Sequence, residues 1–183
     1  QNNMLWLDLS LPVYVPSDSG SEYAVTSLSI TYNTTFRKIR FGERFASISE
    51  GPFRQSAIIE RLDNLGHTQV TALPYCFLHE CAGAPLHSQT YEANDFIPET
   101  LVSVGDYFYS GGPYLVGTLR LPNFKTISAN ANYGSAFSGR TAGVTNLYLT
   151  CETLTTLSPA FFTGMKLQEL TIGSTNLPTA VSG

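Results

Sequence analysis

Charged residues are scarce in this 183-residue chain, at 13% of the total, and lysine is nearly absent. The 14 acidic and 10 basic residues give a net charge of −4 and form no run of either sign. A basic patch for nucleic acid and a polybasic membrane segment are therefore not predicted. No apolar stretch approaches the ~20 residues of a membrane-spanning helix. The short apolar segment 4–9 is interrupted by Asp8, and we do not expect it to be a signal peptide.

Cysteine is also rare, and the three cysteines are Cys76, Cys81 and Cys151. An odd number leaves two alternatives, which are one disulfide with a free thiol or three buried thiols. Two cysteines and the three histidines lie close together in the sequence, namely His67, Cys76, His79, Cys81 and His87. Zinc sites usually combine paired cysteines with paired histidines, whereas the C-x₄-C spacing here stands alone. The pattern favours structural thiols, and we expect no metal or cofactor.

Motifs for catalysis are missing as well. The chain contains neither a G-x-S-x-G nucleophile elbow nor a glycine-rich phosphate loop. Carboxylates such as Glu43, Glu50, Asp63 and Glu80 are scattered, and nothing in their spacing places them in one pocket. The sequence therefore predicts a protein without enzymatic activity, and a zinc-dependent enzyme is the least favoured hypothesis.

What the chain does contain is apolar and aromatic residues, at 43% and 12%, in a recurring pattern. The segments 101–111 and 154–164 share an aliphatic residue, a second one three positions later, and aromatics four and five positions after that. The same spacing begins at Phe45, Val70 and Phe124, although the aromatic of the last block, Phe137, arrives late. We interpret the pattern as about five repeats and a partial sixth. The key aliphatic positions, which recur at uneven intervals, are Ile48, Leu73, Val104, Ile127 and Leu157.

Short segments in which apolar and polar residues alternate precede these blocks. Residues 39–41, 119–121, 147–149 and 170–172 each read apolar, polar, apolar, which is typical of a strand with one buried face. In the two less regular repeats, Leu65 and Ile97 occupy the expected strand slots. Stacked units of this kind predict a solenoid with a shared core, in which the row formed by Phe53, Phe77, Phe108 and Phe161 is buried.

Two segments have the composition of loops, and the beginning of the chain has no repeat. Residues 79–95 and 129–143 are rich in small and polar residues, which predicts insertions between repeats. Residues 1–34 contain extended, alternating segments, and we expect them to form a β cap over the open end of the stack. The predicted organisation is thus a cap at 1–34 and a solenoid at 35–183.

Segments 101–111 and 154–164 resemble the BspA-type class of leucine-rich repeats. That family combines a short strand, often ending in proline, with an L-x-x-I-G-x-x-A-F-x-G-C segment. Residues 119–122 (Leu-Arg-Leu-Pro) resemble the strand end, residues 104–108 the middle, and residues 73–81 the closing part, with Cys81 in the cysteine position. The resemblance covers about four-fifths of the chain. It implies a β-rich leucine-rich-repeat solenoid of short parallel strands with few short helices, and a secreted or cell-surface protein that acts in adhesion.

The alternating strands also predict a binding face. If the apolar residues point inward, the polar ones between them point outward and form a ladder at strand spacing, about 4.8 Å. The predicted ladder consists of Lys38, Arg40, Arg120, Asn146, Tyr148, Glu169 and Thr171. Tyrosine and arginine are enriched at the centres of interfaces. The partner predicted for this face is a protein or a glycan.

Two further expectations concern assembly and modification. The near absence of lysine and the abundance of threonine, serine and asparagine also suit a structural subunit of a virion, filament or surface layer. In that hypothesis, copies of the chain stack through exposed solenoid ends. Asn33-Thr34-Thr35 matches the acceptor motif for N-glycosylation, which matters if the chain passes through a eukaryotic secretory pathway.

Overall fold

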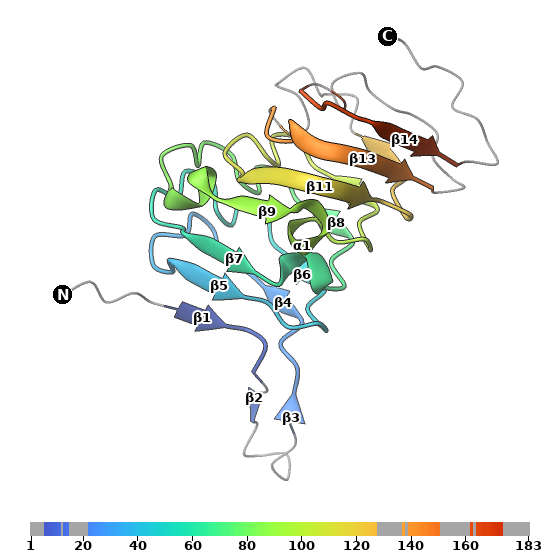
Figure 1. Ribbon diagram of the computed structural model, residues 1–183. Helices are drawn as coiled ribbons and strands as arrows, with labels where there is room; N and C mark the ends of the chain where they lie inside the picture. Colours follow the sequence, from blue (N-terminus) through green and yellow to red (C-terminus); the bar gives the residue numbers. More distant parts are fainter. Residues whose placement is uncertain are drawn as a thin grey trace.

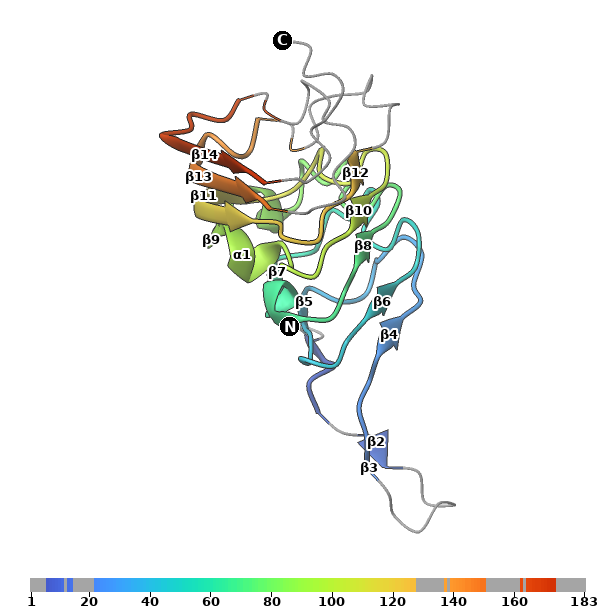
Figure 2. The same cartoon turned by 90° about the vertical axis from the view of Figure 1, so that its right-hand side faces the viewer.

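The computed structural model describes residues 6–11, 13–14, 22–127, 137, 139–150, 162 and 164–173. The chain winds into a β-solenoid of about five turns with almost no helix. A turn typically contributes one strand to a front layer and one to a back layer (Figure 1). Figure 2 shows the two layers side by side, with the connecting turns between them. The predicted solenoid of short parallel strands is confirmed.

The front layer consists of two parallel sheets that follow each other along the solenoid. The three-stranded front sheet contains, in spatial order, β1 (Trp6–Asp8), β5 (Lys38–Arg40) and β7 (Arg61–Asp63). The four-stranded front sheet contains β9 (Thr90–Glu92), β11 (Tyr114–Arg120), β13 (Gly143–Leu149) and β14 (Glu169–Ile172). The four alternating segments of the sequence all fall on front strands, namely β5, β11, β13 and β14.

The back layer repeats the spacing of the aliphatic positions. It consists of a sheet of β4 (Ser27–Leu28) and β6 (Ser47–Ile48), and a sheet of β8 (Ala72–Leu73), β10 (Ser103–Val104) and β12 (Thr126–Ile127). Leu73, Val104 and Ile127 pair with one another in register, and Ile48 pairs with Leu28. The repeat alignment derived from the sequence therefore matches the pairing of the strands. Leu157 lies outside the described residues.

The core lies between the two layers. Front strands contribute aliphatic side chains with no exposed surface, among them Ile39, Leu62, Leu119 and Leu147. Fully burying such a side chain stabilises the fold by about 1.5–3 kcal/mol relative to leaving it exposed. A unit of one or two short strands cannot bury this surface alone, so the stack is stable only as a whole.

Of the predicted phenylalanine row, Phe53, Phe77 and Phe108 are buried in successive turns. The ring centroids of Phe53 and Phe77 are 5.4 Å apart, and those of Phe108 and Phe137 are 5.3 Å apart. Phe137 thus takes the aromatic slot of its repeat although it arrives late in the sequence, and it also contacts Tyr109. Phe161 lies outside the described residues.

The turns that follow three of the back strands share a backbone conformation. Gly51, Cys76 and Tyr107 each stand three positions after the aliphatic residue of a back strand, and their φ angles are 57°, 55° and 56°. Glycine adopts this left-handed conformation freely, whereas other residues adopt it at a cost of roughly 1 kcal/mol. The turn therefore keeps its backbone geometry from repeat to repeat, although the residue at this position changes. For that reason the sequence alone does not reveal the shared turn.

The strand slots predicted in the two less regular repeats were wrong. Leu65 lies in the 3₁₀ helix η1 (Leu65–His67), and the strand of that turn, β7, ends two residues before it. Ile97 follows the short helix α1 (Ala93–Phe96), whereas the strand is β9 at residues 90–92. In both repeats a short helix follows the strand and buries apolar residues of its own. The sequence analysis therefore mistook apolar residues in or next to the helix for the apolar residues of the strand.

Residues 79–95, which were predicted to be an inserted loop, contain regular structure. The segment includes the 3₁₀ helix η2 (Pro85–Ser88), the strand β9 and the beginning of α1. The segment is therefore not an inserted loop. It is rich in polar residues partly because two of the three positions of β9 are exposed. Most of the second predicted insertion, residues 129–143, lies outside the described residues.

The described part of segment 1–34 contributes to both layers. Strand β1 pairs in parallel with β5, and β4 pairs in parallel with β6. Between them, β2 (Val13–Tyr14) and β3 (Glu22–Tyr23) form an antiparallel pair. This pair projects from the end of the stack (Figures 1 and 2). That residues 1–34 act as a cap stays a prediction.

Candidate functional site

The outward face of the three-stranded front sheet carries charged side chains in two rows. The pairing register aligns Trp6 with Lys38 and Arg61, and it aligns Asp8 with Arg40 and Asp63. The apolar residues between these rows point inward, and Ile39 and Leu62 have no exposed surface. The outward positions predicted for Lys38 and Arg40 agree with this register. The sequence analysis missed the residues that flank them, which are Trp6 and Asp8 on β1 and Arg61 and Asp63 on β7.

Most of these charges are paired within the sheet. The Arg61 guanidinium lies 2.8 Å from Asp63, and Arg40 lies 3.5 Å from Asp8. The Asp63 carboxylate raises the pKa of Arg61. A hydrogen bond donated by the Ser10 hydroxyl, together with the Arg40 charge, lowers the pKa of Asp8. Exposed pairs of this kind contribute about 0–1 kcal/mol each, so their main effect is to orient the side chains.

The four-stranded front sheet brings together the other five residues of the predicted ladder. Asn146 pairs with Glu169 on the next strand, and the Asn146 Nδ2 donates a 2.8 Å hydrogen bond to the Glu169 carboxylate. Arg120 pairs with Tyr148, and its guanidinium carbon lies 4.3 Å from the centroid of the Tyr148 ring. Thr171 continues this row on β14.

A second pair of arginine and tyrosine lies at the other end of the same strands. The guanidinium carbon of Arg140 lies 4.1 Å from the centroid of the Tyr114 ring, and 46% of Tyr114 is exposed. Stacking of this kind contributes about 0.5–2 kcal/mol. Only 9% of Arg140 is exposed, whereas Arg120 is an exposed residue, so it is the Arg120 guanidinium whose edge is open to further hydrogen bonds. Among the described residues, neither Arg120 nor Arg140 forms an ion pair with a carboxylate. Sequence analysis missed Arg140 and Tyr114 because neither lies in an alternating triplet.

The helix α1 holds the end of β11 in place. The Asn94 side chain donates a 3.0 Å hydrogen bond to the Arg120 carbonyl and accepts one of 2.7 Å from the Arg120 amide. These two bonds imitate the pairing that a longer β9 would make with β11. They also fix the backbone at the residue whose guanidinium stacks on Tyr148.

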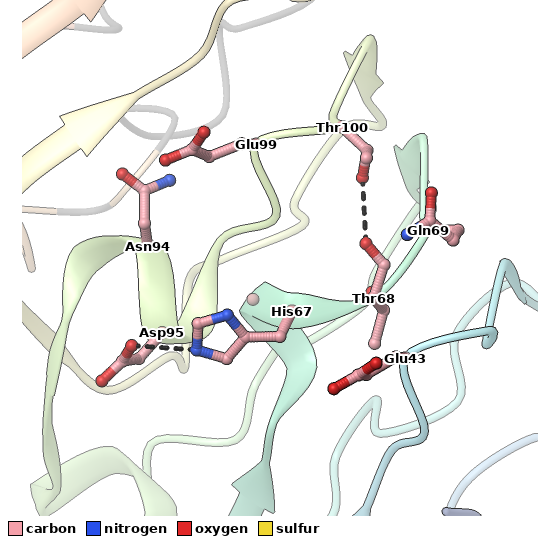
Figure 3. Close-up of a pocket in the computed structure, with 9 residues that line it drawn as sticks. Glu43, His67, Thr68, Gln69, Asn94, Asp95, Glu99 and Thr100 are labelled. Carbon is pink, nitrogen blue, oxygen red and sulfur yellow. Dashed lines mark hydrogen bonds and ion pairs between the residues drawn. The ribbon is translucent and has the colours of Figure 1, made fainter.

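Beside the front layer, the turns that follow β5, β7 and β9 enclose a hollow of about 430 Å³ (Figure 3). This hollow is lined by Glu43, Gly66, His67, Thr68, Gln69, Asn94, Asp95, Glu99 and Thr100. The His67 Nε2 lies 3.2 Å from the Asp95 carboxylate, and more than half of each side chain is exposed. The sequence analysis considered His67 only for zinc and treated Glu43 as a scattered carboxylate. It did not group the lining residues, because they come from three turns that are far apart in the sequence.

The residues considered for zinc make other contacts. Cys81 is buried, its thiol donates a hydrogen bond to the carbonyl of Phe53, and burial raises its pKa to about 11. Cys76 is buried with a free thiol. The rings of His79 and Tyr107 meet edge to face, with their centroids 4.6 Å apart, and His87 contacts the carbonyl of Gly111. Among the described residues, no three histidine, cysteine or acidic side chains are placed to hold a metal ion.

The amide of Asn33, the predicted acceptor for a glycan, is part of a turn. Only 4% of Asn33 is exposed, and its Nδ2 donates a 2.6 Å hydrogen bond to the carbonyl of Phe36. Its Oδ1 accepts hydrogen bonds from the amides of Thr35 and Phe36. A glycan on Nδ2 would have to displace this turn, so the geometry argues against modification of the folded chain.

In the part of the chain that the structure describes, no helix has the length and apolar character needed to cross a membrane. No model of a protein family matches the sequence. A search of curated proteins also finds no match.

A solved structure does match the fold. It is a leucine-rich repeat protein from Bacteroides ovatus, with a TM-score of 0.52 and 15% sequence identity over 90% of this chain. The aligned region spans 38% of that longer protein. The similarity concerns the fold alone, and the BspA-type subclass stays a prediction. Parallel front and back strands, aliphatic ladders in register and this structural match together show that the chain has the fold of a leucine-rich-repeat solenoid.

Proposed function

We propose that the chain is a non-catalytic binding module that presents the outward face of its front sheets to a protein partner. The observation that carries the proposal is the in-register set of outward side chains on the four-stranded front sheet, centred on Arg120 and Tyr148. Arginine and tyrosine supply much of the binding energy at interfaces, and sheet faces of solenoids commonly bind partners.

We further propose that the module acts in adhesion outside the cell or on its surface, with a protein or a glycan as ligand. This proposal follows the resemblance of the repeats to the BspA-type class. The exposed aromatic rings of Trp6 and Tyr114, 53% and 46% exposed, suit either ligand, because a flat apolar face packs on a sugar ring as well as on a side chain.

A photo-crosslinking experiment tests the binding face. A benzophenone amino acid at position 148 should crosslink to the ligand from panels of surface proteins and glycans, and the same group at position 75 on the back side should not. The double variant Arg120→Ala/Tyr148→Ala should then weaken binding of the captured ligand about tenfold or more. Lys125→Ala/Tyr75→Ala is the matched control, since it removes a cation and a tyrosine away from the front face. Equal binding by both variants would refute the proposal.

A second candidate function is that of a structural subunit that stacks end to end. At the β14 end, Leu170 and Ile172 are 47% and 38% exposed, and such surface at a sheet edge attracts another copy. Light scattering over a range of concentrations distinguishes the two functions. A mass that rises with concentration, and falls back in Leu170→Asp/Ile172→Asp, supports assembly. A constant monomer mass rejects it.

A further inference from the structure

The hollow beside the front layer has walls that the fold holds in place. Gly66 packs directly on α1, because a Cβ at this position would overlap the carbonyl of Asn94. The Thr100 hydroxyl donates to the carbonyl of Val70 at 2.7 Å, which ties the turn after β9 to the turn after β7. The hollow is therefore preformed, and its volume falls in the range of about 300–1,000 Å³ that is usual for ligand pockets.

Much of the hydrogen-bonding capacity of the lining is used by the fold itself. Thr68 donates to the carbonyl of Leu65, and the amide of Asn94 bonds the backbone of Arg120. Among the described residues, the carboxylates of Glu43 and Glu99 form no ion pair and accept no hydrogen bond from a side chain or backbone. The groups left open to a ligand are thus chiefly acceptors.

The charge of the lining is negative throughout. Of its three carboxylates, Glu43 comes from the turn after β5, and Asp95 and Glu99 come from the turn after β9; no lysine or arginine lines the hollow. His67, the only other group that can carry charge, is paired with Asp95. The carboxylates are not gathered at one point where a metal ion could be held among the described residues. Acceptors spread around a hollow of this size suit a wide, planar cation with several donors.

We propose that this hollow receives an arginine side chain of the protein that binds the front sheets. The inference rests on the proposed function and adds a contact beside the face. A guanidinium offers five donors in one plane and can reach carboxylates on separate turns, whereas an ammonium is a compact charge. In this arrangement, the aliphatic part of the arginine side chain packs against Gly66 and Thr100, and its guanidinium group lies among the three carboxylates.

The test is a titration followed by amide NMR shifts. N-acetyl-arginine methylamide is compared with its citrulline counterpart, which has the same shape without the charge, and with the lysine counterpart. The expected result is a saturable shift at residues 66–69 and 94–100 with arginine, and binding about fivefold or more weaker with citrulline. Equal shifts from arginine and citrulline, or stronger binding of lysine, would overturn the proposal.

Variants of the lining give a second readout. Glu43→Gln/Glu99→Gln keeps the shape of the hollow and should weaken the arginine titration, while Glu50→Gln/Glu80→Gln, which alters two carboxylates elsewhere, should leave it unchanged. Equal effects of the two double variants would mean that only the overall charge matters and would reject the site. The Arg120→Ala/Tyr148→Ala variant should titrate normally with arginine, so failure of the binding face and failure of the hollow are distinguished.

Discussion

Both front sheets carry arginine side chains, but these arginines have different partners in the two sheets. In the three-stranded sheet, Arg61 and Arg40 each have a carboxylate within 3.5 Å. In the four-stranded sheet, Arg120 and Arg140 lie on tyrosine rings and have no carboxylate partner among the described residues. Paired charges are already satisfied, whereas the stacked and exposed guanidinium of Arg120 still offers donors to an incoming group; Arg140, only 9% exposed, offers far less. This difference is the reason why the proposed binding function assigns the contacts with a partner mainly to the four-stranded sheet.

The largest expected effect concerns the junction between the two halves. Gly66→Ala would force a Cβ into the backbone of α1, which cannot move without breaking the bonds between Asn94 and β11. We expect the free energy of unfolding to fall by about 3 kcal/mol, measured by urea denaturation. Gly83→Ala is the control, since no atom lies within 4 Å of the Cβ there. A loss no larger than that of the control would mean that the junction adapts freely.

The second prediction concerns the hydrogen bonds between Asn94 and the end of β11. The Asn94→Ala variant leaves the amide and carbonyl of Arg120 without their side-chain partner. We expect a loss of about 1–2 kcal/mol in the free energy of unfolding. The Asn123→Ala variant removes a single bond to the carbonyl of Glu99 and should cost less. Comparable losses in the two variants would show that the Asn94 bonds do not hold β11.

The third prediction compares the halves directly with matched pairs. Trp6 and Arg40 form a stacked pair at 4.8 Å in the three-stranded sheet, as Tyr148 and Arg120 do at 4.3 Å in the four-stranded sheet. Arg120→Met should weaken binding of the captured ligand about tenfold, and Arg40→Met no more than about twofold. Surface plasmon resonance measures both. A stronger effect at Arg40 would reverse the roles assigned to the two halves.

The smallest expected effect is the dependence of stability on acid. The pKa of Asp8 is lowered in the folded chain, so the stabilising contribution of its carboxylate is present above its ordinary value of 3.8 and is lost as the pH falls through the folded pKa. Because the pair with Arg40 is exposed, the change should not exceed about 0.5 kcal/mol. Thermal unfolding of the wild type and of Asp8→Asn between pH 6 and pH 2 measures it. Identical pH profiles would show that Asp8 contributes nothing.

Sequence reasoning recovered what depends on period and burial. The aliphatic positions Ile48, Leu73, Val104 and Ile127 were aligned correctly, because a parallel ladder repeats the same residue type in each turn. The outward positions on β5, β11 and β13 agree with the alternation, whereas on β14 the apolar residues Leu170 and Ile172 are exposed as well. The strand β9 was missed because Tyr91 is only partly buried and both of its neighbours are exposed.

The hollow and the contrast between the sheets were not accessible from the sequence. Glu43 lies in the turn after β5, and Asp95 and Glu99 lie in the turn after β9, so only the stacking of the turns brings them to the same hollow. Whether an arginine pairs with a carboxylate or stacks on a tyrosine depends on the register between strands that are far apart in the sequence, as for Asp8 and Arg40. Because the turns differ in length, the sequence alone does not show which residues of neighbouring strands are paired.

The break in the front layer has a consequence for how the molecule opens. Within residues 22–127, no strand ladder joins β7 to β9, and the two sheets meet through α1, η1 and the hydrogen bond from the Leu62 amide to the Tyr91 hydroxyl. In a solenoid, each turn is stabilised mainly by its neighbours, so an interruption in the ladder weakens the coupling across it. Amide protons of β7 and β9 should therefore exchange with solvent through partial openings, while those of β11 and β13 exchange only in deeper unfolding. The back-layer pairing of β8 with β10 crosses the same boundary, so the openings should be local to the front layer while the two halves stay coupled through the back layer.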